Sequence, residues 1–553
     1  MVKSFQDKIK AYTLENALSH NGKAVVQAVL GHLFKEGLKK QDIKQVMPLI
    51  NTEVKKVNSL SLEEQKKEFS NLDKLVKKAS KQRQGLPELV SAVKGKVVTR
   101  LAPEPSKYNH LGHALSFLLN YVYSKKYNGK CILKFEDANP EKVSKEYVDA
   151  MKQDIIDYLG IKVSKTIFIS DDIPRLYKYA EKLIKIKKAY MCFCKREEMQ
   201  KLRRQGIECS CGLREVNDNL KEWKKFLNGD YMNGKAVLRL KGNMQSNNAV
   251  MRDPVIFRAL KAKHYRQGEK YKIWPMFDFY NPIEDSLIKV THILRSNEFN
   301  DRLELQNYIL KLLKLKKQII VQYGRFNVIG STTKGREIRE LIDSGDYTGW
   351  DDPRLMTLKA LKKRGIIKET FYELIEQIGL SKYQVNLDFD MIASINRKLI
   401  DKSSDRYSFI QEPIKLEVNK KPDIKQISVG VHPEKKQTRK INLQSSIYVS
   451  RKDYEMFSGK EIRLMHLFNI ALKKNNKAEF TSKENKDIQK VQWVSDFVNA
   501  RILMPDGSWI SGIAEKAIEK LKPEAIIQFE RVGFVKFDKI NKAGEYEFRF
   551  AHR

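Results

Sequence analysis

The chain has 553 residues, more than one hydrophobic core can organise, and this length indicates about three or four domains. Its 105 lysines and arginines outnumber 68 aspartates and glutamates, and the formal net charge of +37 predicts a polyanionic partner, unless the lysines serve only to solvate the surface. No apolar run reaches roughly 18 residues and the first residues lack a secretory signal, so we expect a cytoplasmic protein rather than a membrane-spanning or secreted one. We also expect a monomer.

Residues 1–95 are predicted to form a helical N-terminal extension. Apolar residues recur at helical spacing between residues 24 and 30, which gives an amphipathic stripe. The segment 55–84 is rich in lysine and poor in large apolar side chains, so we expect a solvated helix or a linker there. No residue of this extension is assigned a chemical role.

From residue 96 onward, short β-branched runs alternate with helical patterns. Strands are predicted at residues 97–101, 131–135 and 166–170, and helices at 112–126, 141–159 and 174–188. Such alternation is typical of a parallel sheet with helices on both faces, a Rossmann-like α/β arrangement. Ligands of these sheets bind at the carboxyl ends of the strands, where Arg100, Glu136 and Asp137 stand. The alternative for the two acidic residues is an ordinary loop.

Two histidines begin the helix that follows the first strand. His110 and His113 frame Gly112, and they come after two prolines that end the strand, since proline cannot join a ladder. A helix N-terminus has free N–H groups and the positive end of the peptide dipoles, so it favours anions. Gly112 removes a side chain between the imidazoles, which would let a phosphate or a flat ring approach the backbone. We therefore predict a nucleotide phosphate site, the alternative being histidines that cap the helix or lie on its surface.

Four of the five cysteines lie within twenty residues of one another. Cys192 and Cys194 form one Cys-x-Cys pair, and Cys209 and Cys211 form a second after a short basic helix. Four thiolates can hold one tetrahedral ion, and zinc is the usual choice. Because four protein ligands leave no open position, we predict a structural zinc site, the alternative being four free thiols. Cys131 stands alone on a strand and is expected in the core.

The alternating pattern breaks between residues 191 and 272, which indicates an inserted domain. The sheet is predicted to resume at residues 274–279 and to continue with a strand at 288–294. From about residue 405, many short β runs predict all-β barrels. The predicted division is an N-terminal extension (1–95), a catalytic domain (96–190 and 273–345), an inserted domain (191–272), a helical connector (346–404) and a β-barrel region (405–553).

The sequence resembles the class I aminoacyl-tRNA synthetases, in particular their glutamyl/glutaminyl branch. The succession of strand, Pro-Glu-Pro, His-Leu-Gly-His and helix in residues 97–113 is similar to the first signature of that class. The sequence Ser-Thr-Thr-Lys at 331–334 resembles a degenerate form of the Lys-Met-Ser-Lys-Ser loop, with Ser331 in place of the first lysine and Lys334 matching the second. The sequence Gly-Trp-Asp-Asp-Pro-Arg-Leu at 349–355 is the most specific match.

The β runs after residue 405 resemble the anticodon-binding barrels of archaeal-type glutamyl-tRNA synthetases, whereas the bacterial glutamyl enzymes carry a helical module there. The resemblance implies ATP-dependent activation of L-glutamate to glutamyl-adenylate and its transfer to the 3′ end of tRNA-Glu. It leaves open whether tRNA-Gln is also charged. It implies that ATP acts with Mg²⁺, that the cysteines hold a structural Zn²⁺, and that residues 191–272 bind the acceptor stem. The alternatives are a glutaminyl-tRNA synthetase, a non-catalytic RNA-binding paralogue and a free-standing adenylyltransferase.

The resemblance also implies roles for individual residues. Catalytic roles fall to His110, His113 and Lys334, ATP contacts to Pro103, Gly112, Thr333 and Lys334, and glutamate contacts to Arg100, Glu136, Phe277, Asn281 and Arg295. Arg295 matches the arginine that faces the substrate's side-chain carboxylate, and the glutaminyl enzymes keep no arginine there, so it favours glutamate. Glu136 matches the residue that faces the α-amino group. Phe277 departs from the family, which usually has a tyrosine there, so one hydroxyl donor is lost.

Overall fold

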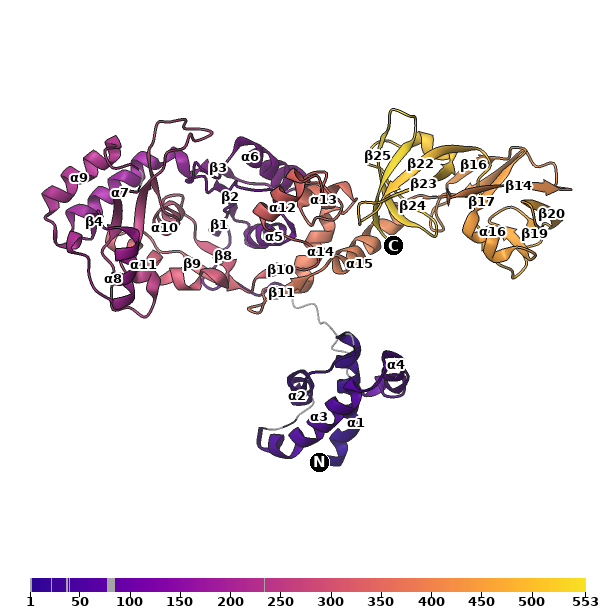
Figure 1. The fold of residues 1–553 in the computed structure, drawn as a ribbon, viewed down its shortest axis with the longest axis horizontal. Coiled ribbons are helices and arrows are strands. Elements are labelled where there is room, and N and C mark those ends of the chain that lie inside the picture. Colours follow the sequence, from indigo (N-terminus) through magenta and orange to yellow (C-terminus); the bar gives the residue numbers. More distant parts are fainter. Residues whose placement is uncertain (1, 21, 36–37, 39, 77–84, 233) are drawn as a thin grey trace. The chain divides into compact units, whose positions relative to one another are not determined.

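The computed structural model describes residues 2–20, 22–35, 38, 40–76, 85–232 and 234–553. The chain divides into two compact units, Met1–Arg83 and Gln84–Arg553 (Figure 1). Within the described ranges, every helix is too short or too polar to span a bilayer.

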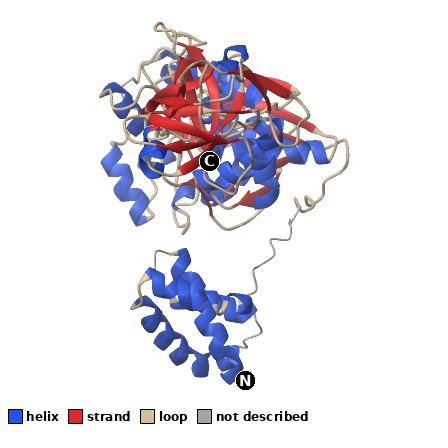
Figure 2. Ribbon diagram, turned by 90° about the vertical axis from the view of Figure 1, so that its right-hand side faces the viewer, coloured by secondary structure: helices blue, strands red, loops and turns tan. Residues whose placement is uncertain are grey.

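The first unit is built from helices in its described part (Figure 2). They are α1 (Val2–Ser19), α2 (Val26–Lys35), α3 (Ile43–Asn58) and α4 (Leu62–Ser70), with short 3-10 turns at Lys40–Asp42 and Asp73–Leu75. Leu14, Leu33 and Ile50 are fully buried where the apolar faces of the first three helices meet. The lysine-rich segment 55–84 is therefore helical over much of its length, while its residues 77–84 lie outside the described residues.

A parallel sheet forms the centre of the second unit. Its strands are β1 (Val98–Leu101), β2 (Lys130–Phe135), β3 (Lys165–Phe168), β8 (His292–Ser296) and β9 (Ile319–Tyr323). β1, β2 and β3 pair in that order, and β8 pairs with β9. The amide of Thr291 donates to the carbonyl of Val98 at 2.9 Å, which sets β8 beside β1. The carboxyl ends of these strands therefore meet at one edge of the sheet.

Helices connect these strands, as the alternating pattern predicts. They are α5 (Leu111–Lys126), α6 (Lys145–Lys152), α7 (Ile173–Lys185), α10 (Phe277–Leu287) and α11 (Leu303–Leu313). The predicted helix 141–159 begins later than expected and ends in a π-helical turn, Gln153–Tyr158. The predicted strand 166–170 ends early, because Ile169–Asp171 forms a 3-10 turn.

A four-stranded antiparallel sheet interrupts the parallel one. It consists of β4 (Ala189–Cys192), β5 (Val237–Leu240), β6 (Val255–Ala259) and β7 (Ile273–Pro275), flanked by α8 (Arg196–Gln205) and α9 (Val216–Asn228). The prediction that the parallel sheet resumes at 274–279 was wrong. β7 pairs antiparallel with β6, and α10 begins at once, burying Phe279 and Ile283 four residues apart on one helical face. Short apolar runs fit either a strand or a buried helix, so the pattern alone could not decide.

The segment after β9 alternates short strands and helices. It contains β10 (Phe326–Val328), α12 (Gly335–Asp343), α13 (Leu358–Lys363), α14 (Lys368–Ile378), β11 (Val385–Leu387) and α15 (Phe389–Ile400). β10 and β11 pair in parallel and so join the second signature to the connector.

The C-terminal region is all-β apart from short helices, which confirms the predicted multidomain fold class. Its strands are β12 (Arg406–Tyr407), β13 (Phe409–Gln411), β14 (Pro413–Asn419), β15 (Gln426–Gly430), β16 (Thr438–Asn442), β17 (Ile447–Ser450), β18 (Glu461–Leu464), β19 (Asn469–Leu472), β20 (Lys477–Ser482), β21 (Lys490–Val491), β22 (Phe497–Leu503), β23 (Trp509–Glu515), β24 (Ile526–Phe529), β25 (Gly533–Ile540) and β26 (Tyr546–His552). Seven strands form one sheet in the order β12-β24-β25-β26-β22-β23-β13. Its two edge strands are neighbours in the chain, separated only by Ser408, so the sheet is nearly closed into a barrel. A six-stranded sheet, β17-β14-β20-β19-β18-β21, and the β15-β16 ribbon complete the region.

Candidate active site

The first signature is anchored by backbone bonds to a distant part of the chain. The amide of Leu111 donates to the carbonyl of Met356 at 3.0 Å, and the amide of Leu358 donates to the carbonyl of Asn109 at 2.9 Å. Residues 356–358 directly follow the Gly-Trp-Asp-Asp-Pro-Arg-Leu sequence. That sequence thus holds the start of α5 in place.

The two histidines share one tautomer. The amide of Gly112 donates to Nδ1 of His110 at 3.1 Å, and the amide of His110 donates to Nδ1 of His113 at 3.2 Å. Each Nδ1 is therefore an acceptor, so each ring carries its proton on Nε2. The rings stack with their centroids 3.8 Å apart. Burial lowers the pKa of His110 well below its usual range and that of His113 to about 3, so both are neutral hydrogen-bond donors at neutral pH.

Gly112 is needed for a reason that the sequence did not reveal. A Cβ at this position would lie 3.1 Å from Cε1 of His110 and 3.1 Å from the carbonyl oxygen of Phe326. The glycine thus lets β10 and the His110 ring approach the start of α5. This packing role adds to the ligand approach that the missing side chain is predicted to allow.

A buried group of charges lies at the ends of β1 and β2. Asp285 accepts from Nζ of Lys134 at 2.7 Å and from Nε of Arg100 at 3.1 Å. Nζ of Lys134 also lies 3.4 Å from Oε1 of Glu136, to which Asn281 donates a short hydrogen bond. Burial raises the pKa of Glu136, and Lys134 and Arg100 oppose that rise. Although burial alone would raise the pKa of Asp285, the same two cations hold it below its usual value.

Sequence reasoning missed Lys134, whose side chain is fully buried. The available signal was a lysine between the apolar residues Leu133 and Phe135 near the end of a predicted buried strand, because a buried ammonium needs a carboxylate partner. Its partner Asp285 lies 151 residues later in the chain, and no local pattern connects the two.

Arg295 has free donors in the same cavity. Its side chain is buried, and Nη1 donates to Oε1 of Gln306 at 2.9 Å. In the part of the chain that the structure describes, Nε and Nη2 of this arginine have no hydrogen-bond partner. Burial lowers the pKa of Arg295 to about 10, which still leaves the side chain charged at neutral pH. Two free N–H groups of one guanidinium match a carboxylate that binds in a bidentate manner.

The second signature supplies a far more exposed group. Lys334 caps the start of α12, and its side chain is 77% exposed and pairs with Glu337 at 2.7 Å. The neighbouring carbonyl of Thr333 accepts a hydrogen bond from Nζ of Lys107 at 3.1 Å. Lys107 belongs to the first signature loop, and sequence reasoning missed it.

One cavity of about 470 Å³ joins these groups. All eleven amino-acid and ATP site residues expected from the resemblance line it: Arg100, Pro103, His110, Gly112, His113, Glu136, Phe277, Asn281, Arg295, Thr333 and Lys334. Lys107, Tyr323 and Arg325 line it as well. The arginine and carboxylate groups thus lie in the same cavity as the helix N-terminus and the loop lysine.

Asp137 holds the end of β2 in position. Its carboxylate accepts from the amide of Ser170 at 2.9 Å, from the Ser170 hydroxyl at 2.7 Å and from the Tyr265 hydroxyl at 3.1 Å. Nε2 of His264 lies 2.9 Å from the Asp137 carbonyl, and its Nδ1 accepts backbone amides, so Nε2 is the donor. These bonds tie the inserted region to the strand that presents Glu136.

Comparison with known proteins assigns the chain to a family. Residues 96–402 match the catalytic domain of the tRNA synthetases class I (E and Q), and residues 404–489 and 470–538 match two anticodon-binding domains of the same class. The glutamate–tRNA ligase of Methanocaldococcus jannaschii is 38% identical over 99% of this chain and 100% of that protein. That of Pyrococcus furiosus is 37% identical over 96% of each. The chain belongs to the class I (E and Q) tRNA synthetases.

A solved structure of a glutamate–tRNA ligase from Elizabethkingia meningosepticum is more distant, with 16% identity and a TM-score of 0.40 over 55% of this chain and 70% of that one. The membership in the class I (E and Q) family therefore rests on the sequence matches.

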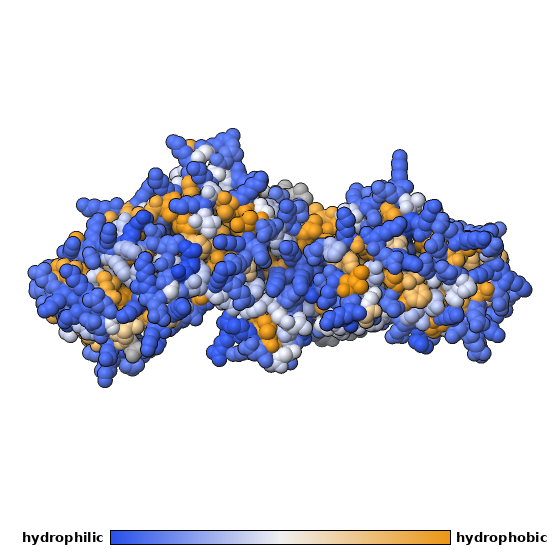
Figure 3. All heavy atoms as spheres, turned by 90° about the horizontal axis from the view of Figure 1, so that it is seen from above, coloured by the Kyte–Doolittle hydropathy of each residue, from blue (hydrophilic) through white to orange (hydrophobic). Residues whose placement is uncertain are grey.

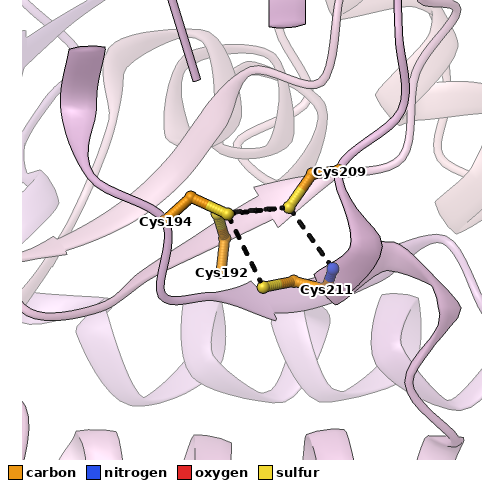
Figure 4. Close-up of side chains that lie close together, drawn as sticks. All are labelled: Cys192, Cys194, Cys209 and Cys211. Carbon is orange, nitrogen blue, oxygen red and sulfur yellow. Dashed lines mark hydrogen bonds between the residues drawn. The ribbon is translucent and has the colours of Figure 1, made fainter. Parts of the chain in front are cut away.

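This class I (E and Q) synthetase brings its four clustered cysteines together between β4 and α9 (Figure 4). The sulfur atoms all lie within 4.8 Å of one another, with Cys194 3.2 Å from Cys209 and 3.9 Å from Cys211. Four thiolates around zinc, with Zn–S distances of about 2.3 Å, stand about 3.8 Å apart. The donor set and its spacing thus fit a tetrahedral ion.

Proposed function

We propose that this chain is a glutamate–tRNA ligase, which activates L-glutamate with ATP and transfers it to the 3′ end of tRNA-Glu. The observation that carries this proposal is Arg295, a buried guanidinium with two unpartnered N–H groups in the cavity that also holds the two signatures. A buried cation without a counter-charge is unfavourable, so the site is completed by a carboxylate from its ligand.

Charge balance supports glutamate over glutamine. The paired charges at the ends of β1 and β2, two cations and two carboxylates, balance one another, and Asp278 near Arg295 is balanced by Arg302. Arg295 is the buried cation left over. Its positive charge is cancelled by glutamate, which carries two carboxylates and one ammonium. Glutamine is neutral overall, so it would leave Arg295 buried without a counter-charge.

The remaining substrate contacts follow from the same geometry. Glu136 is held by Asn281 and Lys134 and would accept the substrate's α-ammonium, which also keeps its carboxylate ionised. The ring of Phe277 packs against the ring of Phe299, with their centroids 5.7 Å apart, and its side chain has no hydrogen-bonding group to offer the substrate.

The phosphate end of the cavity would bind ATP, which enters with Mg²⁺. The glutamate α-carboxylate attacks the α-phosphorus in line, and pyrophosphate leaves. Nε2–H of His110 and of His113 would donate to phosphate oxygens near the N-terminus of α5, and Lys334 would steady the leaving pyrophosphate. Neither histidine needs to transfer a proton, because positioning and charge stabilisation dominate phosphoryl transfer.

We assign the other regions to tRNA. Residues 191–272 would bind the acceptor stem, residues 405–553 the anticodon, and residues 1–95 would form an extension of the synthetase. The net charge of +37 supplies an attractive field, and the face seen in Figure 3 is mostly hydrophilic. Because lysines and arginines displace counterions from RNA, tRNA affinity should fall steeply with salt. We also propose a cytoplasmic monomer, and tRNA-Gln as a further acceptor.

We further propose that the four cysteines hold a structural Zn²⁺, which has no open position for catalysis. Metal analysis of the C209S/C211S double variant tests this. Loss of about one zinc per chain relative to the unchanged protein is expected from a single four-thiolate site. Unchanged zinc content would refute the site.

Parallel aminoacylation assays test the proposed activity. Purified tRNA-Glu and tRNA-Gln are each offered with glutamate and with glutamine. We expect glutamate alone to be attached, to tRNA-Glu and also to tRNA-Gln. Exclusive attachment of glutamine would indicate the glutaminyl alternative, and no ATP–pyrophosphate exchange with tRNA present would indicate the non-catalytic one.

A further inference from the structure

Lys107 connects the two signature loops. It lies three residues before His110, and its Nζ donates to the Thr333 carbonyl at 3.1 Å. A Cβ on Gly335 would lie 3.1 Å from Cβ of Lys107 and 3.2 Å from its Cδ. The glycine that begins α12 thus makes room for the lysine stem, and Lys107 lines the same cavity as both loops.

The Lys107 ammonium lacks a counter-charge. Among the residues that the structure describes, no carboxylate forms an ion pair with it, whereas Lys334 is paired with Glu337 at 2.7 Å. Burial lowers the pKa of Lys107, Glu104 opposes this, and Arg325 and Arg339 lower it further. Lys107 is thus a half-buried cation with two arginines and one glutamate around it, and it forms a hydrogen bond to a carbonyl but no ion pair, so it favours an anionic ligand.

The surroundings match a polyphosphate. α5 begins at Leu111, four residues after Lys107, and α12 begins at Gly335, which contacts the Lys107 stem. The positive ends of both helix dipoles favour anions, although the first amides of α5 are already hydrogen-bonded within the protein. In the second signature, Ser331 stands at the position of the first lysine of the Lys-Met-Ser-Lys-Ser loop. The cation missing from one loop is thus replaced, inside the same cavity, by a cation from the other.

We propose that Lys107 is a catalytic residue that binds the β- and γ-phosphates of ATP and stabilises the departing pyrophosphate. This inference rests on the proposed function. An oxygen of the glutamate α-carboxylate forms a bond to the α-phosphorus of ATP. At the same time the bond between the α-phosphorus and the oxygen that bridges to the β-phosphorus breaks, and its electron pair leaves with pyrophosphate. Lys107 stays protonated throughout and transfers no proton.

Ligand affinity separates this role from that of a simple tether between loops. ATP and adenosine are titrated into the full-length chain and into the K107M, K107R and K359M variants, and binding is followed by calorimetry. K107M should weaken ATP about ten-fold and adenosine less than about two-fold, because only ATP carries the phosphates. K107R keeps the charge and should stay within about three-fold of the unchanged protein for ATP.

K359M is the matched control. The ammonium of Lys359 lies over the ring of Tyr108, and Tyr108 is the residue that follows Lys107 in the chain. Lys359 itself does not line the cavity. Its loss removes one positive charge from the same neighbourhood, and ATP affinity should stay within about two-fold. If K107M does not fold, which thermal unfolding will show, K107Q takes its place.

Kinetics give the second readout. In ATP–pyrophosphate exchange with tRNA present, K107M should lower kcat about ten- to one-hundred-fold and leave the KM for glutamate unchanged. Unchanged ATP affinity, or an equal loss for ATP and adenosine, would overturn the proposal. Failure of the proposed function is distinguishable, because the unchanged chain would then show no glutamate-dependent exchange while the ATP-to-adenosine comparison could still be made.

Discussion

The two ends of the active-site cavity are built differently. Behind the end proposed to bind glutamate, Lys134 and Asp285 are fully buried, and strands and helices of the core hold them. At the phosphate end, Lys334 is 77% exposed and lies on a loop between β10 and α12. Rigid, desolvated charges suit the discrimination of one amino acid from another, whereas an exposed loop can move as pyrophosphate forms and leaves. With the site residues in their proposed roles, specificity and turnover lie on separate scaffolds within one cavity.

Of the substitutions considered, Arg295→Gln should cause the largest loss of activity with glutamate. Without the guanidinium, the substrate carboxylate meets no counter-charge in a buried site, so kcat/KM for glutamate should fall about a thousand-fold. Steady-state aminoacylation with glutamate and glutamine measures both substrates. Arg336→Gln removes an exposed guanidinium, 88% accessible, and serves as the control. Retention of glutamate activity within ten-fold would contradict the assignment.

Lys134→Met should lower the free energy of unfolding, whereas Lys334→Ala should leave it unchanged. Removing Lys134 leaves Asp285 and Glu136 without their shared cation, and breaking such a buried pair costs about 3–5 kcal/mol. Urea unfolding of both variants measures this difference. The double variant K134M/E136Q should recover part of the loss, because Glu136 is the carboxylate that loses its ion-pair partner, whereas Asp285 keeps Arg100. Equal unfolding free energies for the two single variants would contradict the proposed difference between the buried end and the exposed end.

Lys334→Ala should affect turnover alone. Its ammonium is exposed, so its removal leaves the fold intact, but the leaving pyrophosphate loses a stabilising charge. We expect kcat for exchange to fall about one-hundred-fold with the KM for glutamate unchanged. Lys145→Ala removes a comparably exposed lysine, 79% accessible, from α6 as the control. A large rise in the KM for glutamate would show that the two ends are not separate.

A pH dependence of stability is expected from His113. Its pKa is about 3 in the folded protein and near 6.5 when unfolded, so the unfolded chain binds more protons between these values. This contribution to stability is present above about pH 6.5 and is lost as the pH falls toward 3. His113→Asn should flatten the fall in unfolding free energy with acid over that window. An unchanged slope would show that His113 titrates normally.

Local patterns predicted the parts of the site that are local in the chain. The strand, the prolines and the paired histidines of the first signature could be read directly, as could the Cys-x-Cys pairs. Lys107 could not, because its partner Thr333 lies 226 residues away. The same holds for Lys134 and Asp285. The strand expected at 274–279 failed because a short apolar run fits two structures, and only packing against β6 decides between them.

The nearly closed seven-stranded sheet has a consequence for assembly. One extended stretch, residues 406–411, supplies both of its borders: β12 pairs with β24, and β13 pairs with β23. The two borders of the sheet therefore meet at Ser408, and we call this junction the seam. Because the border strands are paired, little unpaired backbone is offered to a neighbouring molecule, which protects against edge-to-edge aggregation. The seam also cannot seal until β24 has been synthesised, more than one hundred residues later. A chain released before β24 would expose the β12 border, and such fragments should associate through it.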